Sequence, residues 1–296
     1  MSILVSSISV PFQKGEAAAV ELALRRAGVK NPKSAYIVKS SVDARRRSEI
    51  KFVYTVGIEC DHEEEVVRRA GDSNVRLRKP QLPELVCGGR TLANRPVVIG
   101  FGPAGMFAAL TLARMGYAPL VLERGGDVDS RVAAVEGFWK GGSFDSRSNV
   151  QFGEGGAGTF SDGKLTTRIN DPLCETVLEA FVAHGADPSI LRKAKPHIGT
   201  DYLRRVVKSI REEIIRLGGE VRFNTRVTGF SARSGRLTAV RTEAGEIPAE
   251  VVILAVGHSA RDTFQTLFEK GISMEAKAFA VGLRIQHPQK QINLSQ

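Results

Sequence analysis

The most informative stretch of this 296-residue chain spans residues 96–123 and reads PVVIGFGPAGMFAALTLARMGYAPLVLE. Its apolar run at 97–99 lacks the alternation of a half-exposed strand, as expected for a parallel strand covered on both faces. A glycine turn at 100–105 follows, and Gly116 then ends an apolar helix. A second apolar run ends on Glu123. The order strand, glycine turn, helix, strand and acid predicts a βαβ unit.

The residues of the glycine turn suit the binding of a diphosphate. Gly100 permits a tight turn, Gly102 lets the backbone approach a pyrophosphate, and Gly105 lets the helix approach the strand. Pro103 suits the first helical turn, whose free amides and dipole attract an anion. Glu123 lies 18 residues after Gly105, where an acid accepts hydrogen bonds from ribose hydroxyls. The sequence predicts an adenine-dinucleotide site, NAD or FAD, over a glycine turn of purely structural purpose.

Residues 137–163 contain eight glycines and are expected to form an irregular loop. Long irregular loops within compact domains usually carry function. Backbone amides at 155–159 would wrap a large ligand, as nests of amides do for anions. A mobile surface loop is the alternative, but Phe144, Phe152 and Phe160 would be costly to leave in water. The segment therefore favours a cofactor-binding loop.

The chain beyond residue 194 alternates helix and strand signals. Residues at helical spacing predict a helix that Thr200 or Asp201 caps and Gly218 ends. Four strands are expected to follow, three of them forming a β-meander before a buried strand that ends at Gly257. The expected strands are 220–223, then the meander at 227–231, 237–242 and 246–248, and finally 251–256.

The first ninety residues predict a separate small domain. Periodicity indicates the order βαββαβ, which fits a ferredoxin-like α+β sandwich but also other small α+β folds. A Pro and Gly stretch at 79–89 suits a linker. The expected strands are 3–10, 34–42, 50–59 and 75–78, and the expected helices are 14–27 and 62–70.

The whole pattern resembles the glutathione-reductase-type FAD fold, in which a βαβ unit precedes a helix, a strand, a meander and a strand ending near Ala-Thr-Gly. Residues 255–257 take that last place, with Val256 in place of Thr. Three stretches, 149–165, 195–201 and 257–263, look like the signature of a poorly characterised family of bacterial NAD(P)/FAD-dependent dehydrogenases. The likeness covers nearly the whole chain. It implies FAD and redox chemistry without a settled substrate.

The expected architecture is α/β: a Rossmann-like FAD-binding domain, with a parallel sheet and a meander, preceded by the small basic domain. We expect boundaries at 1–90, 91–270 and 271–296, the last being the start of an incomplete substrate domain whose first strand falls at 277–285. Proteins of this fold usually continue and return to the FAD sheet with a Gly-Asp or Gly-Glu segment. The resemblance thus implies a truncated chain with an incomplete flavin end, which puts its retention of FAD and its activity in question.

Candidate site residues follow from the motifs and the resemblance. Histidine is the usual proton carrier near neutral pH, and His197 and His258 both stand beside glycine-bearing turns, so either is a candidate proton shuttle, against a packing or capping role. Lys164 is a candidate to offset charge on reduced flavin, or a solvent-facing lysine. No metal site is expected. The residues expected to contact FAD are Gly100, Gly102, Pro103, Ala104, Gly105, Glu123, Arg124, Gly155, Gly156, Ala157, Gly158, Thr159, Val227 and Gly257.

Composition narrows the function. The net charge of +10 is concentrated in residues 1–95, and its densest cluster, 45–47, has no interleaved aromatic residue, which favours a solvated hairpin tip over a nucleic-acid patch. No apolar run approaches the roughly 20 residues of a membrane span, and the N-terminus lacks a signal pattern, so a cytoplasmic location is expected. Three widely spaced cysteines suggest reduced thiols. The sequence predicts an FAD-dependent oxidoreductase, with NAD(P)H as a candidate electron donor. The alternative prediction is an RNA-binding protein with a structural dinucleotide site.

Overall fold

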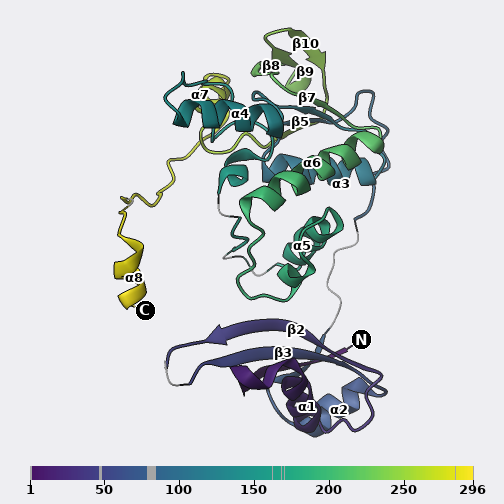
Figure 1. Ribbon diagram of the computed structural model, residues 1–296. Coiled ribbons are helices and arrows are strands. Elements are labelled where there is room, and N and C mark those ends of the chain that lie inside the picture. The colour runs from purple at the N-terminus through teal and green to yellow at the C-terminus, as the bar shows by residue number, and fades with distance from the viewer. Residues whose placement is uncertain are drawn as a thin grey trace.

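The first sheet of the computed structural model is antiparallel and has the strand order β2-β3-β1-β4. Helices α1 and α2 cover the same face of this sheet (Figure 1). Its core holds the inward side chains Ile3, Val5, Val56 and Ile58, all without exposed surface. The element order βαββαβ is the one expected from periodicity. The bounds are β1 Ser2–Pro11, α1 Gly15–Ala27, β2 Ser34–Asp43, β3 Lys51–Glu59, α2 Glu63–Ala70 and β4 Val75–Arg78, with a short helix η1 at Phe12–Lys14.

The structure describes residues 2–46, 49–78, 85–161, 163–167, 169, 171–283 and 285–295. Within these ranges the basic cluster of the first sheet lies on the exposed connection between β2 and β3, and its Arg47 falls outside the described residues. Arg45 there pairs with Asp43, whose pKa falls to about 2 because Arg45 donates hydrogen bonds to it. The described residues include no helix with both the length and the apolar character that crossing a membrane requires.

The second sheet is parallel, with the order β11-β5-β6-β7. Both of its faces are covered, which explains the continuous apolar runs. Val98 and Val121 point into the core beneath α3 and α6, whereas Val97 and Leu122 point into the core shared with the meander. The bounds are β5 Val97–Ile99, α3 Pro103–Arg114, β6 Leu120–Leu122, α6 Thr200–Arg216, β7 Glu220–Arg222 and β11 Val252–Leu254, with the meander at β8 Val227–Arg233, β9 Arg236–Thr242 and β10 Gly245–Pro248.

Helix α6 is amphipathic, as its periodicity predicts. Its buried residues are Leu203, Val206, Val207, Ile210 and Ile214, and each contributes about 1.5–3 kcal/mol through burial. The N-cap prediction was wrong. Gly199 occupies that position without a side-chain bond, because the Thr200 hydroxyl donates to the carbonyl of Ser161 at 2.8 Å instead.

The remaining elements are helices that follow β6 in the chain. The expectation of irregular backbone from residue 137 was wrong at its start, because α4 continues to Trp139. Asp127 caps α4 by accepting from the Ser130 amide at 2.8 Å. Helix α5 was not expected. The bounds are α4 Val128–Trp139, η2 Gly156–Phe160, α5 Leu173–Ala183, η3 Pro188–Leu191, α7 Arg261–Glu269 and α8 Gln289–Ser295.

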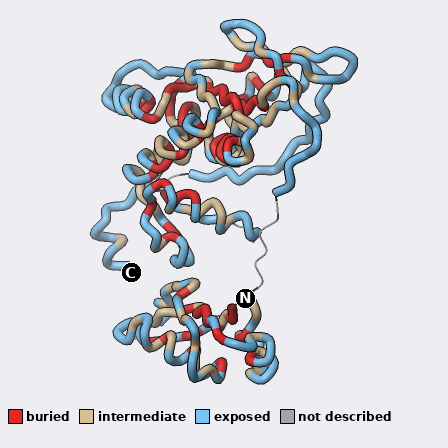
Figure 2. Tube along the Cα trace, turned by 90° about the vertical axis from the view of Figure 1, so that its right-hand side faces the viewer, coloured by how far each residue is buried: buried red, intermediate tan, exposed pale blue. Residues whose placement is uncertain are grey.

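The strand expected at residues 277–285 is absent from the described part of that segment, residues 277–283 and 285, and this prediction was wrong. A strand persists only when a neighbour satisfies its backbone hydrogen bonds, and the structure pairs this stretch with none. Figure 2 shows the consequence, since exposed positions run along the C-terminal stretch while buried ones mark the strands and inward helix faces.

Candidate functional site

A pocket of about 470 Å³ opens at the carboxyl edge of the parallel sheet. This edge is where open α/β sheets bind ligands, and the size falls within the range of roughly 300–1,000 Å³ of small-molecule sites. The glycine turn, the glycine-rich loop and the end of β11 form its walls. The lining residues are Gly100, Gly102, Pro103, Ala104, Glu123, 151–153, 156–158, 254–259 and Phe264.

A smaller cavity adjoins the pocket and shares Glu123 and Phe152 with it. Its other walls include Arg124, Val227 and Thr263, from β6, the meander and α7 respectively. The pocket therefore extends from the helix end toward the meander, along the carboxyl ends of the strands.

The glycine turn places the amino end of α3 directly against β5 and β11. A Cβ on Gly105 would lie 1.9 Å from the carbonyl oxygen of Gly100, so only glycine allows this approach. Gly100 has φ +96°, and a Cβ there would lie 2.4 Å from the carbonyl oxygen of Ala255. Gly102 is the N-cap and has no side chain to bond the first-turn amides. Those amides and the helix dipole are available to an anion.

Glu123 joins the glycine turn to the glycine-rich loop. Its side chain is buried, and its Oε2 accepts from the Phe101 amide at 2.7 Å. Its Oε1 accepts from the amides of Gly125 and Gly153, both at 2.9 Å. A carboxylate offers about four acceptor positions, so one stays available beside the pocket. Glu123 thus has a structural task that the motif did not reveal, next to the expected contact with a ribose.

Arg131 holds the glycine-rich loop by its backbone. This side chain on α4 is fully buried, and its guanidinium donates to the carbonyls of Asn149 (2.8 Å), Val150 (2.8 Å) and Glu154 (2.6 Å). It also lies 4.8 Å from the centroid of the Phe160 ring. Burial lowers the pKa of Arg131 to about 10, so it stays charged at neutral pH.

The sequence analysis missed Arg131, although a signal existed. It shares the buried face of α4 with Val128 and Val135, at helical spacing. An arginine at a core position needs partners, and here three main-chain carbonyls supply them.

Glu154 ties the same loop to two helices. It has no exposed surface, and its Oε2 accepts from the Val128 amide at the start of α4, at 2.7 Å. Its Oε1 lies 3.2 Å from Nε of Arg211 on α6, an ion pair whose N–H does not point at the oxygen. Burial raises the pKa of Glu154, and the bond from Val128 opposes this change.

Asp262 binds two guanidinium groups beside the smaller cavity. Arg124 Nη2 lies 3.0 and 3.1 Å from the two oxygens of Asp262, and Arg226 Nε lies 3.0 Å from Oδ2. The Arg124 guanidinium also lies 4.3 Å from the centroid of the Phe152 ring. The cluster joins the end of β6, the start of the meander, α7 and the glycine-rich loop.

The structure brings most of the expected cofactor residues together. Nine line the main pocket: Gly100, Gly102, Pro103, Ala104, Glu123, Gly156, Ala157, Gly158 and Gly257. Arg124 and Val227 line the adjoining cavity. Gly105, Gly155 and Thr159 line neither space. Thr159 is buried and its hydroxyl donates to the carbonyl of Glu154 at 3.1 Å, which shapes the loop from within.

The three candidate catalytic residues do not form one cluster. His258 lines the main pocket, and its Nε2 lies 3.3 Å from the Ser259 hydroxyl, which also donates to Gln151 at 3.2 Å. His197 and Lys164 form an antiparallel backbone bridge and line neither space.

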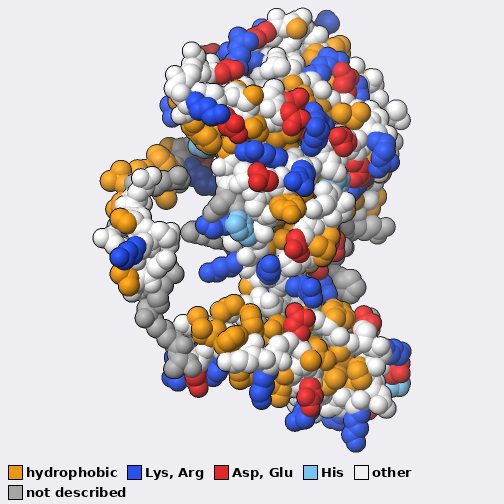
Figure 3. Space-filling view, in the orientation of Figure 1, with side chains coloured by type: hydrophobic (Ala, Val, Ile, Leu, Met, Phe, Trp, Pro, Cys, Tyr) orange, Lys and Arg blue, Asp and Glu red, His pale blue; other side chains and the backbone are white. Residues whose placement is uncertain are grey.

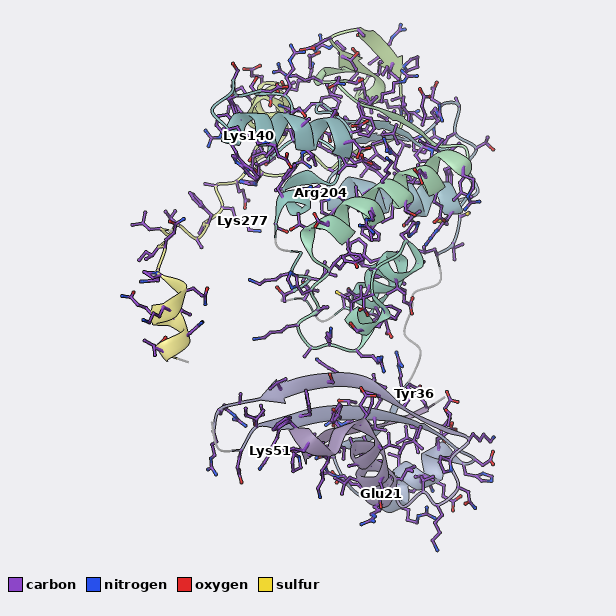
Figure 4. All side chains as sticks on the ribbon, in the orientation of Figure 1. Glu21, Tyr36, Lys51, Lys140, Arg204 and Lys277 are labelled. Carbon is purple, nitrogen blue, oxygen red and sulfur yellow. The ribbon has the colours of Figure 1, made fainter. Side chains whose placement is uncertain are left out.

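The three phenylalanines of the glycine-rich segment have different surroundings. Phe152 lines the pocket, and Phe160 lies beneath the guanidiniums of Arg131 and Arg204, the latter labelled on α6 in Figure 4. Phe144 is 60% exposed, contrary to expectation, and packs edge-on against Phe138 with centroids 5.3 Å apart. The contact between these two surface rings removes part of the area of each ring from water, although neither ring is buried.

The protein has a mixed α/β fold with a pocket at the carboxyl edge of a parallel sheet. Residues 199–293 match the sequence profile of the FAD-dependent oxidoreductase family. The matched segment includes α6 and the meander, whereas the glycine turn lies before it.

One curated relative is a Clostridium beijerinckii protein described as uncharacterized, 49% identical over 261 residues. The match covers 88% of this chain and 49% of that protein, so the chain spans about half the length of this relative.

Similar solved structures include glycine oxidase from Bacillus cereus, at 15% identity and TM-score 0.39, with 60% of each chain covered. L-Proline dehydrogenase from P. horikoshii gives 14% identity and TM-score 0.35, with 61% of this chain and 56% of that chain covered. Thioredoxin reductase from Lactococcus lactis gives 20% identity and TM-score 0.30, with coverages of 54% and 34%.

Proposed function

We propose that the protein is an FAD-dependent oxidoreductase or dehydrogenase. The observation that carries this proposal is that Pro103, at the amino end of α3, and Glu123, at the end of β6, line the same pocket. A helix amino end receives a diphosphate, and an acid at this position binds a ribose. The family match over residues 199–293 supports FAD as the dinucleotide.

The residues of the pocket suit an extended dinucleotide. Gly102 and Gly156 lie against each other in its wall, and a Cβ on Gly156 would lie 3.0 Å from the Cα of Gly102. Two bare backbones therefore form one continuous wall beside the first turn of α3, where a diphosphate can approach their amides. We assign the diphosphate to the amides of this turn and of residues 156–158, and a ribose hydroxyl to the unused acceptor of Glu123.

Bound FAD would supply hydride or electron transfer, and residues of the chain would position the cofactor and transfer protons. His258 is the candidate proton carrier that the pocket favours, because it alone of the three candidates lies in the pocket wall. We retain Lys164 as the candidate that offsets charge on reduced flavin and His197 as a candidate proton shuttle. These two residues form a backbone bridge with each other. NAD(P)H is the proposed electron donor.

We propose the domain boundaries 1–90, 91–270 and 271–296, and a ferredoxin-like fold for the first domain. The antiparallel order β2-β3-β1-β4 with both helices on one face supports that fold. The RNA-binding alternative has no support from the comparisons, and Arg45 of its basic cluster pairs within the chain.

The test is titration of the apoprotein with FAD, followed by flavin fluorescence. We expect saturable binding at one FAD per chain, with ADP competing, and anaerobic addition of NADH or NADPH to bleach the bound flavin. Protein that takes up no FAD would refute the cofactor assignment, and bound flavin that neither nucleotide reduces would refute the proposed donor.

A matched pair of variants tests the pocket. Glu123→Gln should weaken FAD binding at least tenfold, because an amide nitrogen replaces an acceptor of backbone bonds and the ribose contact loses its charge. Glu220→Gln is the control, since Glu220 lies at the amino end of β7, on the opposite edge of the same sheet. Equal affinities of the two variants would contradict the assignment of Glu123.

A further inference from the structure

Beside the smaller cavity, where we expect the adenosine ribose, two guanidinium groups meet one carboxylate, and one of the two guanidiniums, that of Arg124, lines the cavity. Arg124 directly follows Glu123 in the chain and lines this cavity with it. Arg226 approaches from the start of the meander, with its Nη2 2.9 Å from Asp262 Oδ2. Asp262, in the first turn of α7, lies between the two arginines and accepts from both.

The geometry holds Arg124 firmly in this arrangement. Its side chain is 15% exposed, one face lies over the Phe152 ring, and its Nη2 reaches both oxygens of Asp262. Burial alone would raise the pKa of Asp262, but the hydrogen bonds and charges of Arg124 and Arg226 outweigh it and lower the pKa. Asp262 is therefore ionised at neutral pH.

An arginine near the ribose is the group that accommodates the 2′-phosphate of NADP-type ligands, and an acid there selects the free hydroxyl. Guanidinium groups bind phosphate through paired, charge-assisted hydrogen bonds. Here the two guanidiniums are already paired with a carboxylate of the chain. A 2′-phosphate would have to displace Asp262 and would face Glu123 as well, so like-charge repulsion opposes it.

We propose that Asp262 is a specificity-determining residue: it occupies the phosphate-binding position between Arg124 and Arg226 and restricts the site to ADP-containing ligands without a 2′-phosphate. The inference rests on the proposed function only in placing an adenosine ribose beside Glu123. A purely structural Asp262, which ties α7 to the meander, is the competing explanation. It predicts lower stability on substitution and no change in ligand preference.

The experiment compares ADP-ribose with 2′-phospho-ADP-ribose by calorimetric titration of the full chain. We expect the wild type to bind ADP-ribose at least tenfold more tightly. Asp262→Asn releases both guanidiniums while keeping the size of the side chain, so the ratio of the two dissociation constants should shift at least tenfold toward the 2′-phosphate ligand. This gain in relative affinity for 2′-phospho-ADP-ribose should decrease as the salt concentration rises, because it arises from electrostatic attraction.

Two further variants identify the source of the gain. Arg124→Met in the Asp262→Asn background should abolish it. Glu243→Gln is the matched control and should leave the ratio unchanged, because Glu243 lines neither cavity and its nearer partner is Arg147 at 3.0 Å, whereas Arg226 is 3.9 Å away. Asp262→Ser provides the same test with a hydroxyl should the Asn variant fold poorly, as judged by circular dichroism.

The outcomes separate the two proposals. If neither ligand binds the wild type, the proposed dinucleotide site fails. If ADP-ribose binds and the folded Asp262 variants keep the wild-type ratio, the site stands and the role of Asp262 is overturned. Equal binding of both ligands by the wild type would overturn it too.

Discussion

Arg131 shows what a single buried charge does in this protein. It lies under the glycine-rich loop and donates to backbone carbonyls on both sides of Gly153. Because the loop is polar backbone with few side chains, these bonds replace the hydrophobic packing that shapes an ordinary core segment. The arginine therefore positions the loop, and the loop in turn lines the pocket.

We predict that Arg131→Met lowers the free energy of unfolding by about 3–5 kcal/mol, because three buried carbonyls lose their donor and the buried carboxylates of Glu123 and Glu154 lose a nearby positive charge. The fraction that stays folded should bind FAD at least tenfold more weakly. Urea unfolding and FAD titration of the same samples measure both effects.

Arg95→Met is the control for this prediction. Arg95 also donates to main-chain carbonyls, those of Ala118 and Gly218, and pairs with Glu220, but it lies at the opposite edge of the sheet. It should reduce stability without changing the affinity of the folded protein. A normal affinity in folded Arg131→Met would refute the positioning role.

At the scale of elements, three helices of the parallel-sheet layer are joined by one acid. Glu213 on α6 accepts from Arg114 on α3 at 2.9 and 3.1 Å, and lies 2.7 Å from Nε2 of His184 at the end of α5. The Nδ1 of His184 donates to the carbonyl of Ala180 at 2.6 Å. The side chain of Glu213 is largely buried, so the acid connects the helices that cover one face of the sheet.

This connection predicts a pH dependence of stability. The hydrogen bonds from Arg114 hold the pKa of Glu213 below its ordinary value of 4.5. A lowered folded-state pKa contributes stability above the unfolded pKa, and that contribution is lost as pH falls through the folded pKa. Glu213→Gln should therefore unfold more easily at pH 7, by up to about 1 kcal/mol, and the difference from wild type should narrow below pH ~4.

Thermal unfolding between pH 3 and 7 measures this difference. Glu212→Gln, its exposed neighbour on the same helix, serves as the control and should follow the wild type at every pH. A gap between Glu213→Gln and wild type that stays constant over this range would contradict the prediction.

The elements also show how far sequence patterns reach. The βαβ unit and the meander were expected almost to the residue, because their apolar periodicity and glycine stops are local. Helix α4 was missed since Arg131 interrupts its apolar face. Helix α5 could have been predicted, because its apolar residues Val177, Leu178 and Phe181 occur at helical spacing.

At the scale of the whole molecule, the first sheet contacts the rest through backbone bonds. The Ser40 amide on β2 donates to the carbonyl of Arg192 at 2.7 Å, and the Ala194 amide donates back to Ser40 at 2.9 Å. An ion pair joins Arg78 to Glu175 at 2.6 Å. The two layers thus have separate cores and meet through polar contacts.

The C-terminal segment carries exposed apolar side chains, visible as orange groups along it in Figure 3. Phe279, Val281 and Leu283 are 84%, 83% and 96% exposed, and the buried clusters found among the described residues include none of them. Ending the chain after Gly271 should therefore leave the urea midpoint unchanged and reduce aggregation, as measured by light scattering. A lower midpoint for the shortened chain would show that this segment stabilises the fold.

Local patterns in the chain were enough to predict the βαβ unit, the meander and the element order of the first sheet and its helices, because glycine turns, caps and apolar periodicity act between near neighbours in the chain. A cytoplasmic location stays a prediction. The contacts around the pocket arise only when distant segments pack together: Arg131 reaches carbonyls 18 to 23 residues away, and Asp262 meets Arg226 and Arg124 from 36 and 138 residues away. Such contacts depend on which faces pack together, and the spacing of residues along the chain does not specify that.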